Sequence, residues 1–133
     1  MKIASMVEKE SSIENEKPMV SSVIYNRLKE NMKLQIDPTL LYAKKLNNDF
    51  SNNITDKDLF GDTRVNSKYN TYYWKGMPPT PICNPGLSSI VAAIYPEKTD
   101  YLYFVAYKDK KKGHIFTSNY ENHKKNVDTN QKR

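Results

Sequence analysis

The feature that most restricts the fold of this chain is a proline-rich segment at residues 76–86. Its sequence, GMPPTPICNPG, contains Pro78, Pro79, Pro81 and Pro85. Each proline fixes its φ angle and lacks a backbone N–H donor, so this segment can be neither a helix nor a central strand. We therefore expect a stiff loop that separates the helices before it from two further helices and a hairpin after it.

Apolar periodicity predicts the helices on either side of this loop. Apolar residues recur at the i, i+3 and i+4 spacing of one helix face, and Pro18 and Pro38 suit the first turn of a helix. We expect such helices over residues 3–10, 18–29, 37–46 and 84–95, a last helix in the polar segment 119–127, and a short helical turn at 55–61. Residues 11–14 offer a capping-box pattern between the first two helices. In the fourth of these helices, the packed face would consist of Leu87, Ile90, Val91 and Ile94.

The end of the chain has the pattern of a β-hairpin. Residues 101–107 are apolar or aromatic on both faces, which predicts a strand in the middle of a small sheet, and residues 114–117 form the antiparallel return strand. Helices followed by a hairpin that cannot close a sandwich predict an α+β fold, with several short helices packed around a small antiparallel sheet. The length of 133 residues fits one domain, 1–133.

Composition narrows the possible partners. The net charge of +6 favours an anionic partner, such as nucleic acid, a membrane surface or a cell-wall glycan, and ten tyrosines suit a groove that binds sugars or bases. Cys83 is the only cysteine, so an intramolecular disulfide is excluded, and we expect a packed side chain rather than a nucleophile. The sequence contains no phosphate-binding glycine loop and no metal-ligand cluster, so we expect no cofactor and no metal.

Glu10 is the first candidate for a catalytic residue. It follows Met6 by four positions and Ile3 by seven, so it lies on the apolar face of the first helix, whereas Glu8 and Lys9 would face solvent. A carboxylate on an apolar face at a helix end has the raised pKa of a general acid. The alternative is a helix-end residue with a solvated head group.

Other polar residues are candidates for catalysis or substrate binding, and each of them also has a purely structural explanation. Asp37 could be a second catalytic carboxylate, as in glycoside hydrolases, or the N-cap of the helix at Pro38. Amide side chains in irregular segments suit sugar hydroxyls but are also common in turns; they are Gln35, Asn70 and Asn84. Tyr69, Tyr72 and Trp74 could stack on sugars or bases or belong to the core, and His114 could face a cleft or solvent.

Several stretches together resemble one protein family. The matching segments, in order, are ASMVEKE at 4–10, VIYNRL at 23–28, LQIDPT at 34–39, YNTY at 69–72, the loop 76–86, YLYFV at 101–105 and GHIF at 113–116. This pattern is similar to that of the YceG-like (MltG) endolytic murein transglycosylases of bacteria. The matches cover nearly the whole chain.

The resemblance implies a lyase that cleaves the β-1,4 bond between N-acetylmuramic acid and N-acetylglucosamine and leaves a 1,6-anhydro ring. One glutamate, matching Glu10 here, would act first as acid and then as base, in a lysozyme-like cleft where Ser11 orients its carboxylate. Substrate contacts are expected from the matched motifs, at Ser11, Asn26, Arg27, Gln35, Asp37, Tyr69, Asn70, Thr71, Tyr72, Asn84 and His114.

The resemblance also implies a place and partners. Family members carry a membrane helix and a LysM-like domain before the catalytic part, so we expect this chain to be the catalytic domain alone. In full-length form it would be anchored at the extracytoplasmic face of the inner membrane, acting on peptidoglycan strands beside cell-wall synthesis proteins, without nucleic acid. Two alternatives from other classes are a hydrolase that uses Glu10 and Asp37, and a non-catalytic module that binds glycan or nucleic acid.

Overall fold

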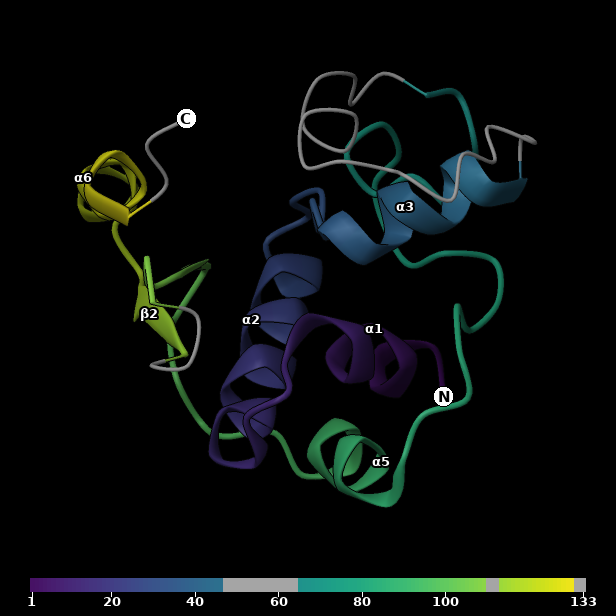
Figure 1. The fold of residues 1–133 in the computed structure, drawn as a ribbon, viewed down its shortest axis with the longest axis horizontal. Helices are drawn as coiled ribbons and strands as arrows, with labels where there is room; N and C mark the ends of the chain where they lie inside the picture. Colours follow the sequence, from purple (N-terminus) through teal and green to yellow (C-terminus); the bar gives the residue numbers. More distant parts are fainter. Residues whose placement is uncertain (47–64, 110–112, 131–133) are drawn as a thin grey trace.

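Five α-helices and a two-stranded sheet make up the parts of the chain that the computed structural model describes, residues 1–46, 65–109 and 113–130 (Figure 1). The elements are α1 (Lys2–Glu10), the 3-10 helix η1 (Glu14–Glu16), α2 (Lys17–Lys29), α3 (Asp37–Leu46), α5 (Leu87–Ile94), β1 (Tyr103–Ala106), β2 (His114–Thr117) and α6 (Tyr120–Asn130). The α+β prediction is confirmed. The helical turn predicted at 55–61 lies outside the described residues.

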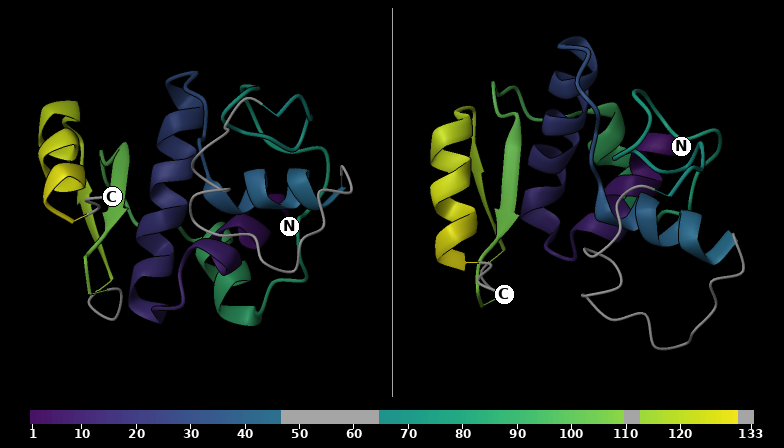
Figure 2. Two further views of the ribbon diagram at one scale, coloured as in Figure 1. Left: turned by 45° about the horizontal axis from the view of Figure 1, so that its top comes forward. Right: turned by 90° about the horizontal axis from the view of Figure 1, so that it is seen from above.

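The elements are arranged in layers, with α6 on the outside of the hairpin, α2 on its other side, and α1, α3 and α5 beyond α2 (Figure 2). Helix α1 is short but central, because it contacts α2, α3 and α5. The main core lies between these helices. It contains Met6, Val7, Val20, Ile24, Leu34, Ile36, Ile82 and Ala92.

Burial of this apolar set is the main driving force for the fold, at about 25 cal/mol for each Å² of apolar surface removed from water. Met6 and Val7 of α1 are fully buried, which confirms the apolar face that their spacing predicts. Since Glu10 ends the same helix, the core packing of α1 also fixes the position of this glutamate.

The strand prediction is correct in place but wrong in one respect. Strand β1 pairs antiparallel with β2, with Val105 opposite Ile115, and the described residues contain no strand on its other edge. Within the described residues, β1 is therefore an edge strand and not a central one. Its apolar character on both faces has another cause, because the hairpin lies between two helices, with α6 against both strands and α2 against β1.

The predicted packing of α5 is wrong. Leu87 is 77% exposed and Ile94 is 63% exposed, whereas Ser89, Ala92 and Ala93 are buried. Helix α5 contacts both α1 and α2, and small side chains on the inner face let helices approach closely. Leu87, Val91 and Ile94 are therefore exposed, and Ile90 is half-buried.

The capping box predicted at residues 11–14 is also wrong. The N-cap of η1 is Ile13, without a side-chain cap bond, and the Ser11 hydroxyl instead accepts a hydrogen bond from the Ile13 amide at 3.2 Å. None of the helices in the described ranges is long and apolar enough to cross a membrane. The same ranges hold no group of three or more His, Cys, Asp or Glu side chains placed to bind a metal ion.

Candidate active site

The site is organised around Glu10, the last residue of α1. Its Oε2 atom is buried and has no hydrogen-bond partner among the residues that the structure describes. A buried carboxylate oxygen without a donor is costly when charged, so such a group tends to keep its proton. The position at a helix C-terminus, where the helix dipole is negative, disfavours the charged form further.

Burial is the main reason that the pKa of Glu10 rises from its ordinary 4.5 to about 8, and the negative charge of Asp37 is the second. At pH 7 roughly nine in ten Glu10 side chains therefore carry a proton. An acid whose pKa lies close to neutral pH is well matched to donate a proton and to take one back.

Asp37 is the first residue of α3 and lies within the helix rather than before it. Its Oδ1 accepts a hydrogen bond from the Tyr72 hydroxyl. Burial and then the Asp37 charge raise the pKa of Tyr72, so this phenol stays protonated and acts as a donor. The structure therefore brings together Glu10, Asp37 and Tyr72, from three parts of the chain that are far apart in sequence.

Asn70 and Thr71 hold Tyr72 in place. Asn70 is fully buried, its Nδ2 donates to the Val65 carbonyl at 2.8 Å, and its Oδ1 accepts from the Tyr72 amide at 3.0 Å. The hydroxyl of Thr71, also buried, accepts from the Ile36 amide at 2.9 Å. Both side chains are engaged by the protein itself, and their predicted contact with substrate stays a prediction.

Asn26 and Arg27 fasten α2 to the segment that leads into the hairpin. Asn26 Nδ2 donates to the carbonyls of Thr99 at 3.0 Å and Tyr101 at 2.9 Å, and Arg27 Nε donates to that of Leu102 at 2.6 Å. Asn26 also lines a hollow of about 850 Å³ between α2 and residues 94–100, and Glu10 does not line it. The structure gives both residues a structural role, and their substrate contacts stay predictions.

The remaining predicted site residues are placed as follows. Gln35 and Asn84 are exposed, and Gln35 has a φ of 51°. The Tyr69 hydroxyl is 2.9 Å from that of Thr80.

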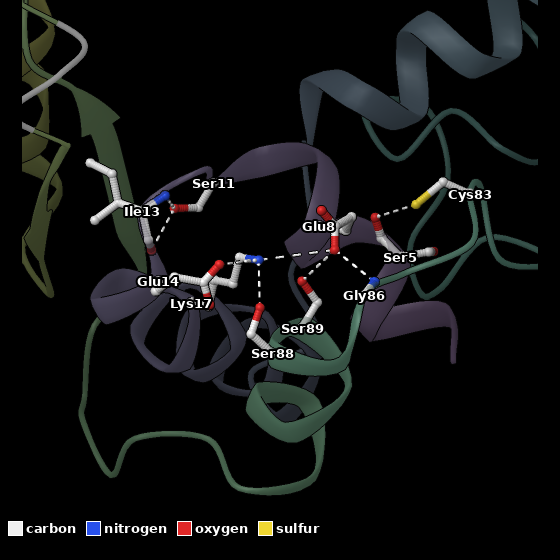
Figure 3. Close-up of polar contacts among 10 residues, drawn as sticks. All are labelled: Ser5, Glu8, Ser11, Ile13, Glu14, Lys17, Cys83, Gly86, Ser88 and Ser89. Carbon is white, nitrogen blue, oxygen red and sulfur yellow. Dashed lines mark hydrogen bonds and ion pairs between the residues drawn. The ribbon is translucent and has the colours of Figure 1, made fainter.

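His114 and Ser11 have partners away from the Glu10 carboxylate. His114 Nδ1 lies 2.9 Å from Glu16 Oε1, and its amide donates to Glu16 Oε2 at 2.8 Å. Ser11 is buried, and its hydroxyl contacts the backbone of Ile13 (Figure 3). The role expected for Ser11, to orient Glu10, stays a prediction.

Sequence reasoning placed Glu8 in solvent, but the structure makes it an anchor. Glu8 Oε1 accepts hydrogen bonds from the Gly86 amide at 2.8 Å and the Ser89 hydroxyl at 2.9 Å, at the N-terminus of α5 (Figure 3). The Gly86 bond, more than any other contact, lowers the pKa of Glu8. Lys17 adds an ion pair at 3.9 Å. A helix N-terminus favours a carboxylate, and this was the one signal that could have identified the contact.

The proline-rich loop also holds α1. The Ile82 amide donates to the buried hydroxyl of Ser5 at 3.1 Å. Cys83 Sγ donates to the Ser5 carbonyl at 3.4 Å (Figure 3). Burial raises the pKa of the Cys83 thiol, which fits a packed residue rather than a nucleophile. Together with Glu8, these contacts fix the short helix that ends in Glu10.

Comparison with known proteins gives the class. The YceG-like family model matches residues 1–129, and the chain belongs to this family. A crystal structure of a putative YceG-like protein from Listeria monocytogenes is 44% identical, with a TM-score of 0.75 over 93% of this chain and 37% of that one.

Two curated relatives are each named endolytic murein transglycosylase. The Bacillus subtilis (strain 168) protein is 43% identical over 124 residues, which is 92% of this chain and 32% of the relative. The Streptococcus pneumoniae (strain D39) protein is 39% identical over 127 residues, which is 94% of this chain and 22% of the relative. The chain thus spans a third or less of the length of these two relatives.

Proposed function

We propose that this protein is a peptidoglycan lytic transglycosylase with Glu10 as its only general acid and base. The observation that carries the proposal is the Glu10 carboxyl group, whose Oε2 atom is buried without a hydrogen-bond partner in the described parts of the chain and whose pKa is raised to about 8. The names of the relatives, endolytic murein transglycosylase, support murein as the substrate. Membership of the YceG-like family supports the same reaction class.

The proposed reaction uses one proton twice. Protonated Glu10 donates its proton to the glycosidic oxygen, and the bond between this oxygen and C1 of N-acetylmuramic acid breaks. Glu10, now a carboxylate, takes the proton of the C6 hydroxyl, and O6 forms a bond to C1. The products are a free 4-hydroxyl on N-acetylglucosamine and a 1,6-anhydro ring, no water is consumed, and Glu10 regains its proton.

The test is a Glu10→Gln variant, which keeps the shape of the side chain but can neither give nor take the proton. Glycan strands are digested with the parent, with Glu10→Gln, and with Glu121→Gln as a matched control at an exposed position of α6. We expect 1,6-anhydromuramyl ends from the parent and the control, and a loss of at least about 100-fold for Glu10→Gln. Release of these ends by Glu10→Gln at the parent rate would refute the proposal.

A glycoside hydrolase is the second candidate, because a second carboxylate, Asp37, acts electrostatically on Glu10. Paired carboxylates can activate water or form a glycosyl intermediate that water opens. The product would then be a reducing muramic acid, heavier than the anhydro form by one water. Mass spectrometry of the released ends therefore distinguishes the two functions.

We further propose that this unit is the catalytic domain of a protein that acts at the cell envelope. Murein as the substrate of the named relatives supports this location. The finer expectations, an anchored full-length form at the extracytoplasmic face of the inner membrane and contact with cell-wall synthesis proteins, come from the family resemblance. Fractionation of cells that carry the tagged full-length protein tests the location.

A further inference from the structure

We propose that Asp37 and Tyr72 are positioning residues that act through Glu10: Tyr72 keeps Asp37 ionised, and the Asp37 charge keeps the proton on Glu10. The inference rests on the proposed function, in which Glu10 is the acid and the base, and it assigns the control of that proton to a second pair of side chains. It also removes Asp37 from the role of a second catalytic carboxylate.

The first step is the contact between the two side chains. The Tyr72 hydroxyl donates to Asp37 Oδ1, and a hydrogen bond to a carboxylate favours its charged form. The position of Asp37 in the first turn of α3 favours that form as well, because a helix N-terminus stabilises negative charge. Glu10 lies at the C-terminal end of its helix, and no donor from the described residues reaches its Oε2. The two carboxyl groups therefore have environments that separate their proton affinities.

The second step is the rigidity of the pair. The hydroxyls of Thr71 and Thr39 lie 2.7 Å apart, and both side chains are buried. Thr71 also accepts from the Ile36 amide at 2.9 Å, next to Asp37, and Asn70 Oδ1 holds the Tyr72 amide at 3.0 Å. The turn that carries Tyr72 is thus attached to the start of α3, so the Tyr72 hydroxyl and the Asp37 carboxylate are fixed relative to each other.

The third step is a survey of the titratable side chains on α1 and on the helices that pack against it. On α1 itself, Glu8 is held at the N-terminus of α5, and Lys9 is exposed. Helix α5 contacts α1 but has no titratable side chain. On α2, Lys17 contacts Glu8 and Glu14, and the Tyr25 hydroxyl donates to a carbonyl of α5.

Four further side chains, on α2 and α3, complete this set of titratable groups. Arg27 on α2 interacts with Tyr72, but its guanidinium donates to the carbonyls of Leu102 and Lys33. On α3, the Tyr42 ring packs against the Tyr69 ring at a tilted angle, and Lys44 and Lys45 lie about two turns beyond Asp37. Of all these groups, Asp37 is the one whose charge acts on Glu10.

The charge of Asp37 would serve both halves of the reaction. Before cleavage, it disfavours loss of the Glu10 proton to solvent. After Glu10 has donated to the glycosidic oxygen, both carboxyl groups are negatively charged, so repulsion by Asp37 makes Glu10 a stronger base towards the C6 hydroxyl. Tyr72 ensures that Asp37 does not compete for that proton.

The first test is the pH dependence of kcat/KM for the parent, Asp37→Asn and Asp37→Glu. In the parent, activity should fall above pH 8 as Glu10 ionises. We expect Asp37→Asn to move this fall about one pH unit lower, because burial, the larger cause of the raised pKa, remains. Activity at pH 6 should stay within about tenfold of the parent. The matched variant Asp37→Glu keeps the charge and should keep the fall within about half a unit.

The second test is whether Tyr72 acts through Asp37. Tyr72→Phe should lower kcat/KM at pH 7 several-fold in the parent, but by less than about twofold in the Asp37→Asn background. Equal losses in both backgrounds would overturn the role given to Tyr72. NMR titration of the Glu10 carboxyl group should show the same lowering of its pKa, about one unit, in Asp37→Asn without any substrate.

Three outcomes separate failure of this inference from failure of the proposed function. If Glu10→Gln is inactive but Asp37→Asn leaves the pH profile unmoved, the inference alone is wrong. If Asp37→Asn is inactive at every pH while folded, Asp37 is itself catalytic and the inference is wrong. If Glu10→Gln is fully active, the proposed function fails first. Should Asp37→Asn not fold, Asp37→Ser removes the same charge with a side chain that suits a helix start.

Discussion

The raised pKa of Glu10 predicts that the free energy of unfolding depends on pH in a specific direction. The folded protein binds the Glu10 proton more tightly than the unfolded chain, where the pKa is near 4.5. This contribution to stability is therefore complete below pH 4.5 and is lost as the pH rises through about 8. The loss is about 1.4 kcal/mol for each pH unit within this window.

The magnitude is large for a domain of this size. Between pH 5 and pH 8 the parent should lose about 4 kcal/mol relative to a protein in which position 10 cannot ionise. Small domains have total stabilities of about 5–15 kcal/mol, so the change should be visible as a lower denaturation midpoint. Glu10→Gln provides the reference, because its amide has the same shape and remains neutral.

The assay is urea unfolding of the parent and Glu10→Gln at pH 5, 6, 7 and 8, followed by tryptophan fluorescence or circular dichroism. The quantity that matters is the difference in unfolding free energy between the two proteins at each pH, because other titrating groups cancel in it. Glu10→Gln should gain on the parent steadily as the pH rises. The control Glu121→Gln, at an exposed site on α6, should differ from the parent by a constant amount. A difference for Glu10→Gln that is also constant from pH 5 to pH 8 would refute the burial of an ionisable Glu10.

Two further predictions concern the anchors of the site. Gly113→Ala should destabilise the fold by about 2–3 kcal/mol in thermal unfolding, because Gly113 has a φ of 88° and an added Cβ would overlap the Glu16 carboxylate; an unchanged Tm would contradict this contact. Glu8→Gln should cost about 1–2 kcal/mol at pH 7, because a neutral amide is a weaker acceptor for Gly86 and Ser89. The Glu8 pKa is lowered by folding, so the cost should shrink as the pH falls towards 4, and a cost that is the same at both pH values would argue against the anchor.

The two short helices α1 and α5 show when the spacing of apolar residues identifies the packed face of a helix and when it does not. In α1 the apolar spacing of Ile3, Met6 and Val7 identified the buried side, and Glu10 followed from it. In α5 the same reasoning chose the wrong side, because close packing against α1 and α2 requires small residues, and Leu87 and Ile94 are left exposed. Periodicity reveals an apolar face, but the size of the neighbouring gap decides whether that face is the one that packs.

Contacts between distant segments explain why the rest of the site could not be predicted. Glu8 appeared to be a solvent-facing charge, because its partners are at Gly86 and Ser89, far along the sequence. Asp37 could be recognised as a helix-start residue, but nothing local indicated that Tyr72 would reach it. Asn70 matched a motif expected to bind sugar, and an amide that binds its own backbone has the same sequence signature.

The most direct test of Glu10 as a lone acid and base is the fate of water in the reaction. Glycan strands are digested by the parent in water labelled with heavy oxygen, and the newly formed muramyl ends are analysed by mass spectrometry. A transglycosylase of this kind yields 1,6-anhydro ends with no label, and Glu10→Gln yields none of these ends above background. Reducing ends that carry the label and are heavier by one water would contradict the role of Glu10 as a lone acid and base. They would show that the cleavage is a hydrolysis.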